Sequence, residues 1–82
     1  MEYRILEIHN PKGWERWGVA YQNEGRVLLF IPAWRSPKVL DVSLEELNED
    51  HYPKTEFEYR WGEVEKTENE DINLFELLYP LG

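Results

Sequence analysis

Residues 14–31, WERWGVAYQNEGRVLLFI, contain two apolar-rich runs separated by Asn-Glu-Gly. In the first run Trp17, Val19 and Tyr21 share one face of a predicted β-strand, because they alternate with small or polar residues. The face of small and polar residues is either exposed to solvent or closely approached by another backbone. Gly25 can adopt the positive φ that a tight hairpin turn needs, because it has no Cβ. We therefore predict a β-hairpin here.

Strand-like patterns also precede and follow this first run. Residues 2–9 are apolar on both alternating faces, which indicates either a strand covered on two sides or one whose register is bent. The returning strand, 26–31, is the most apolar run, and we expect it at the centre of the sheet. Residues 38–42 follow a proline-bounded loop and predict a short edge strand.

Residues 55–67 form the longest predicted strand, in which aromatic residues alternate with charged ones. The apolar parity changes after Trp61, because the next apolar residue is Val64. A β-bulge inserts one extra residue into a strand and shifts its phase in this way. Gly62 is therefore the predicted bulge.

Two short helices are indicated by capping residues. Ser43 followed by Glu46 is a capping box, and it predicts a helix that begins at Leu44. Asn73 followed by Glu76 repeats the pattern near the end of the chain. The expected fold is α+β, with a four- or five-stranded, mostly antiparallel sheet and one or two short helices. A small, partly open β-barrel is the alternative, since hairpins, bulges and short connections also build such barrels.

Length and composition place this fold in a single domain, residues 1–82. The chain is 41% hydrophobic and 15% aromatic, which is too apolar for an intrinsically disordered protein. Its apolar runs are far shorter than a membrane-spanning helix needs. Cysteine is absent, so thiol chemistry and disulfides are excluded, and we expect a cytoplasmic location.

The net charge is −8, and it is unevenly distributed. Residues 1–44 carry five acids and six bases, whereas residues 45–82 carry twelve acids and three bases, so the two parts have charges of +1 and −9. Such a surface repels nucleic acid. The acidic second half indicates one negatively charged face, although a charge run is often only a solvated surface.

Catalytic and cofactor motifs are weak or missing. His51 beside Glu49 and Asp50 is a poor metal site, because neither His9 nor His51 has a histidine partner at metal-ligand spacing. The five glycines form no phosphate-binding loop, so no cofactor is expected.

A small ribonuclease with His51, Glu58 and Arg60 is conceivable, with the glutamate as base and the arginine on the phosphate. However, the acidic surface would repel its substrate.

Aromatic and leucine residues suggest protein contacts. Trp34, in the proline-bounded loop beside Arg35, is a candidate interface anchor, and the alternative is that its ring folds over the sheet to close the core. Leu74, Leu77 and Leu78 fit an L-x-x-L-L pattern, which either docks on a partner or covers the domain's own sheet.

These observations favour a non-enzymatic, acidic protein-binding module that occupies a basic, nucleic-acid-binding surface of a larger protein. A phage anti-defence protein or an immunity protein would fit this description. The alternatives are an accessory subunit of a larger assembly and a small hydrolase that uses His51. The predicted partner-binding residues are Glu56, Glu58, Glu63, Glu65, Glu68, Glu70, Asp71, Trp34 and Arg35.

Overall fold

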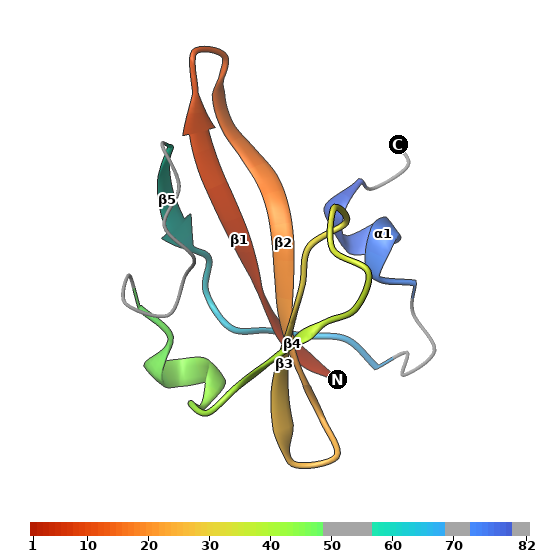
Figure 1. Cartoon of the computed structure of the whole chain (residues 1–82). Coiled ribbons are helices and arrows are strands. Elements are labelled where there is room, and N and C mark those ends of the chain that lie inside the picture. Colours follow the sequence, from red (N-terminus) through yellow and green to blue (C-terminus); the bar gives the residue numbers. More distant parts are fainter. Residues whose placement is uncertain (49–56, 69–72, 80–82) are drawn as a thin grey trace.

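The computed structural model describes residues 1–48, 57–68 and 73–79, which form a curled sheet with two short helical segments (Figure 1). The strands are β1 (Glu2–Asn10), β2 (Gly13–Asn23), β3 (Arg26–Phe30), β4 (Lys38–Leu40), β5 (Glu58–Trp61) and β6 (Glu65–Lys66). The sheet runs in the order β4-β3-β2-β1-β5, β6 also pairs with β1, and every pairing in the described part is antiparallel. A sheet-dominated, antiparallel fold is therefore confirmed, and its curl also fits the half-barrel alternative.

The predicted hairpin is confirmed as β2 and β3. Asn23 pairs with Arg26, and the two residues between them, Glu24 and Gly25, have φ of 52° and 79°. Positive φ at both positions is the two-residue turn whose twist matches the flanking strands. The expectation that the returning strand lies at the centre is wrong: β2 occupies the middle, because only the three-residue β4 follows on the far side of β3.

A bulge that the sequence did not predict interrupts the alternation in β2. Leu6 pairs with Gly18 and Glu7 pairs with Arg16, so Trp17 is left over between the two pairs. Trp17 consequently packs against one face of the sheet, whereas Val19 lies in the core on the other face. The prediction that Trp17 shares a face with the apolar residues after it is therefore wrong.

The predicted irregularity at Gly62 is confirmed. Leu6 pairs with Trp61 in β5, and Tyr3 pairs with Glu65 in β6. The step from Leu6 to Tyr3 is three positions along β1, whereas the step from Trp61 to Glu65 is four, so one extra residue lies between β5 and β6. The expected single long strand is thus two short ones, and residues 55–56 lie outside the described residues. Gly62 has no positive φ, and what its position restricts is volume: a Cβ there would lie 3.3 Å from the Ile5 carbonyl oxygen.

The first helical segment is η1 (Leu44–Glu46), a single 3-10 turn that begins where the sequence predicts. The predicted capping box does not form, because the segment ends at Glu46 itself. The Glu46 N–H donates to the Ser43 carbonyl oxygen at 3.1 Å, and the Ser43 side chain makes no cap hydrogen bond.

The second segment is α1 (Leu74–Leu78), and its predicted cap is confirmed. The Asn73 side-chain oxygen accepts a hydrogen bond from the Phe75 N–H at 2.9 Å. This bond satisfies one of the free N–H groups at the helix start.

The sheet is buried on both faces, as the pattern of residues 2–9 indicates. One face, which we call the η1 face, packs under Leu44 and Leu47, and the other, the α1 face, packs under Leu77 and Leu78. Successive side chains of β1 alternate between them, so that Leu6 belongs to the η1 face and Ile5 to the α1 face.

Arg4 joins the η1 segment to the bulge. Its guanidinium donates to the carbonyl oxygens of Gly62 at 2.6 Å, Leu44 at 2.7 Å and Leu47 at 3.3 Å. Trp61 adds a second link, because its indole N–H donates to the Asn48 carbonyl oxygen at 3.1 Å. The acidic residues next to these carbonyls are thereby brought to the same edge of the molecule.

Candidate functional site

The edge formed by β5, β6 and the residues after them carries four of the predicted carboxylates. Glu58, Glu63, Glu65 and Glu68 are all exposed, and we call them the edge carboxylates. Glu58 pairs with His9, and Glu65 pairs with Tyr3. Tyr3 and His9 are six positions apart in β1, and residues an even number of positions apart in a strand lie on the same face. The two carboxylates therefore project from the same face of the sheet, as the phase shift at the bulge predicts. Glu56, Glu70 and Asp71 lie outside the described residues.

The bases on this edge are matched with acids of β1. Arg60 Nε lies 3.0 Å from Glu7 Oε1, which is the ion pair found in the described part of the chain. Lys66 is the cross-strand neighbour of Glu2. Neither base is thus shown in an ion pair with an edge carboxylate, so the excess negative charge of this edge stays exposed to solvent.

Burial and charge act together on Tyr3, next to this edge. Burial raises the pKa of its phenol above the ordinary 10.0, the Glu65 carboxylate raises that pKa further, and Arg16 opposes the shift. Ionising Tyr3 would place a second negative charge beside Glu65, which is why the carboxylate disfavours it.

Arg60 also contacts an aromatic side chain. Its guanidinium carbon lies 4.1 Å from the centre of the Trp14 ring, a cation–π contact, and the Trp14 ring lies 5.0 Å from that of His9. The sequence did not predict this grouping, because Trp14 and Arg60 meet only when β1 lies between their strands. The ribonuclease hypothesis needs Arg60 for a phosphate, but the guanidinium is already engaged by Glu7 and Trp14.

His51, the histidine of that hypothesis and of the disfavoured metal site, lies outside the described residues, as do Glu49 and Asp50. Within residues 1–48, 57–68 and 73–79, no three His, Asp or Glu side chains are grouped to hold a metal ion.

Trp34 is half-buried and packs against the core of the η1 face. Its backbone N–H donates to the Ile31 carbonyl oxygen at 2.8 Å, which turns the loop back over the sheet. Arg35, beside it, is exposed. The ring therefore helps to close the core, and only its remaining exposed part is available to a partner.

The L-x-x-L-L segment covers the protein's own sheet. Leu77 and Leu78 are buried, and Leu74 packs against the same cluster. Arg16 fixes the far end of α1 by donating to the Leu77 carbonyl oxygen at 2.6 Å. Phe75 is about half exposed and meets Phe30 edge to face, with 5.3 Å between ring centres. Docking of the leucines on a partner is therefore excluded unless α1 leaves the sheet.

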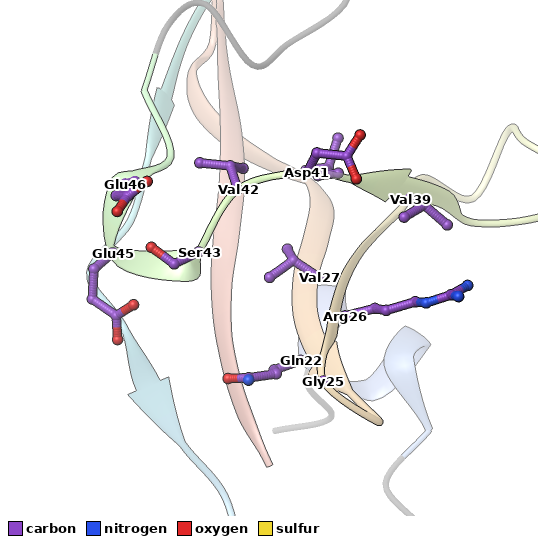
Figure 2. Close-up of a pocket in the computed structure, with 11 residues that line it drawn as sticks. Gln22, Gly25, Arg26, Val27, Val39, Asp41, Val42, Ser43, Glu45 and Glu46 are labelled. Atoms are coloured by element: carbon purple, nitrogen blue, oxygen red, sulfur yellow. The ribbon is translucent and has the colours of Figure 1, made fainter.

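A groove of about 790 Å³ opens on the η1 face, beside the β2–β3 turn (Figure 2). Its floor includes Gln22, Val27 and Leu40, which lie side by side on three neighbouring strands. Val27 is buried in the core of this face, and Leu40 and Val42 are half-buried beside it. The chain that leaves β4 forms the opposite wall.

The walls of the groove are mostly acidic. Of the described residues, Asp41, Glu45 and Glu46 line it together with one base, Arg26. In Figure 2 the Gln22 side chain reaches toward the wall that carries Glu45, whereas Arg26 extends away from that wall. Among these acids the sequence pattern singled out only Glu46, as a capping residue. It did not predict the groove, because no local pattern indicates that the chain after β4 lies opposite the hairpin.

Comparisons of this chain with protein-family models, with curated proteins and with solved structures found no match. Among the described residues, no helix has the length and apolar character to span a bilayer.

Proposed function

We propose that this protein is a non-enzymatic binding module whose edge carboxylates meet a basic surface of a larger protein. The observation that supports this is the exposure of every glutamate described between residues 45 and 68, none of which forms an ion pair within the described residues. Carboxylates that stabilised the fold would be expected to have partners. These instead project a negative potential that steers a basic partner toward the edge.

The partner that best fits is a protein whose basic surface binds nucleic acid, so that carboxylates take the place of phosphates. An inhibitor of a nucleic-acid-processing enzyme, such as a phage anti-defence protein or an immunity protein, works in this way. The expected signature is an association rate that falls as the salt concentration rises, because screening shortens the reach of the charges.

An accessory subunit of a larger assembly is the second candidate, and exposed apolar side chains favour it. Phe57, Val64 and Tyr79 are 45%, 39% and 58% exposed. A permanent apolar interface would bury such residues and would respond little to salt.

The test is a triple charge reversal, Glu58→Lys, Glu63→Lys and Glu65→Lys, compared with the wild type. A matched control reverses Glu15, Glu24 and Glu76, which lie elsewhere on the surface. Each triple variant changes the net charge from −8 to −2.

A protein captured by the wild-type bait is purified, and its association with each variant is measured between 20 and about 300 mM salt. We expect at least tenfold slower association for the edge variant, a flatter salt dependence, and competition by double-stranded DNA. Equal effects of the two triple variants would make the acidity a solubility device. Salt-independent binding by all three proteins would favour the accessory subunit.

A further inference from the structure

We infer that the groove on the η1 face receives an arginine side chain of the partner. This inference rests on the proposed function for the basic character of that partner. The groove adds what the exposed edge lacks, namely a concave, partly apolar site that binds one particular side chain.

The floor matches the stem of an arginine. Val27 and Leu40 lie side by side in it, and Val42 enters from the opposite wall. Val27 is buried beneath the groove, whereas Leu40 and Val42 are half-buried and Val39 is 47% exposed, so the apolar surface open to an occupant comes from these last three side chains. Three methylene groups laid along this floor would be removed from water while the charged end stays hydrated, which is how long basic side chains usually bind to apolar surfaces.

The acceptors around the floor match the guanidinium. Glu45 and Glu46 supply carboxylates, and Gln22 supplies an amide oxygen from the hairpin. In the Figure 2 view, Glu45 and Gln22 lie on opposite sides of the gap. A guanidinium has five N–H donors in a planar fork, so it can bond to acceptors on two sides at once.

Charge complementarity sets the sign of the occupant. Among the described residues, three carboxylates and one guanidinium line the groove, so this part of its lining is negative. The guanidinium of Arg26 points away from the Glu45 wall (Figure 2), so it does not neutralise that wall. An acidic or phosphorylated occupant would meet repulsion there, whereas a cationic side chain is attracted.

The test uses a small probe, the blocked tripeptide acetyl-Gly-Arg-Gly-amide, together with the citrulline version, which has nearly the same shape and no charge. Each peptide is titrated into the ¹⁵N-labelled protein at low salt, and backbone amide shifts are followed. We expect the arginine peptide to shift the amides of Gln22, Val27 and residues 40–46, and to bind at least tenfold more tightly than the citrulline peptide.

Two double variants locate the binding. Glu45→Gln with Glu46→Gln should weaken the arginine peptide at least tenfold. Glu15→Gln with Glu76→Gln removes the same charge elsewhere and should change its affinity less than twofold. All four side chains are exposed, so the variants should fold, and their amide spectra check this.

Equal binding of the two peptides, or equal effects of the two double variants, would overturn the inference. So would shifts confined to the β5–β6 edge. The proposed function can fail separately: it fails if charge reversal of the edge carboxylates leaves partner association unchanged, whatever the peptides do at the groove.

Discussion

Replacing Arg4 should destabilise the protein more than replacing any other described arginine. The guanidinium makes two short bonds, at 2.6 Å to the Gly62 carbonyl and at 2.7 Å to the Leu44 carbonyl, and a longer one to Leu47. Hydrogen bonds to a charged group contribute about 1.5–3 kcal/mol each. Because Arg4 is only partly buried, the lower figure is appropriate, and two such bonds give about 3 kcal/mol for Arg4→Met.

That loss is a large fraction of the total. Domains of this size have unfolding free energies of roughly 4–12 kcal/mol, by the usual range of about 0.05–0.15 kcal/mol per residue. A loss of about 3 kcal/mol should lower Tm by about 12 °C or more, at 4–8 °C per kcal/mol. Urea unfolding provides the free energy, and hydrogen exchange at Gly62 shows whether the bulge opens first.

Two controls separate geometry from charge. Arg4→Lys keeps the charge but cannot reach carbonyls in several directions at once, so it should recover less than half of the lost stability. Arg35→Met removes an exposed arginine and should change the unfolding free energy by less than about 0.5 kcal/mol. If Arg4→Met were as stable as Arg35→Met, the three carbonyl contacts would contribute nothing, and the reasoning would be refuted.

Three further outcomes are expected. Asn73→Ala should cost about 1 kcal/mol in urea unfolding because it removes a cap, whereas Ser43→Ala should cost less than about 0.5 kcal/mol; equal costs would contradict the observed caps. Gly18→Ala should destabilise more than Gly62→Ala, since the added Cβ would lie 3.0 Å rather than 3.3 Å from a backbone carbonyl oxygen; the reverse order in thermal melts would show that the sheet relaxes more easily at β2. The Tyr3 phenol should ionise above pH 10.0 in ultraviolet titration. Its contribution to the free energy of unfolding is therefore complete below that pH and is lost as the pH rises through the folded-state pKa. Glu65→Gln should bring the pKa of Tyr3 closer to 10.0.

Local signals in the sequence predicted the elements that depend on neighbouring residues. The Glu24–Gly25 turn, the Asn73 cap and the irregularity at Gly62 each follow from a few consecutive residues, and each is present. The bulge at Trp17 was missed because its apolar alternation continues without interruption. A bulge there changes which face a side chain joins, and that depends on the strand opposite.

The candidate site was less predictable, for a related reason. The sequence indicated exposed acids in the second half but not where they gather, because Arg4 and Gly62, which bring η1 to the sheet edge, are 58 residues apart. The groove likewise lies between the hairpin and the chain after β4. Neither the acidic edge nor the groove has a local sequence pattern, since both depend on which segments the fold brings together.

The pairing of β1 with β5 has a consequence for how the chain folds. β1, β2 and β3 are joined by turns of two residues, so these strands can assemble within microseconds of one another. The second edge of β1 pairs with residues 49 to 55 positions away, and such distant contacts slow folding because a long loop must close first.

During that interval the meander exposes the open edge of β1, with its run of isoleucine and leucine. An unpaired apolar edge is a template for pairing with other chains, so we expect any aggregation during folding to begin at this edge. The strand that finally covers it carries Glu58, and the next carries Glu65. Once they are in place, the edge that faces the solvent is charged and discourages further strand addition. The same carboxylates that would attract a basic partner would therefore also keep copies of the protein apart.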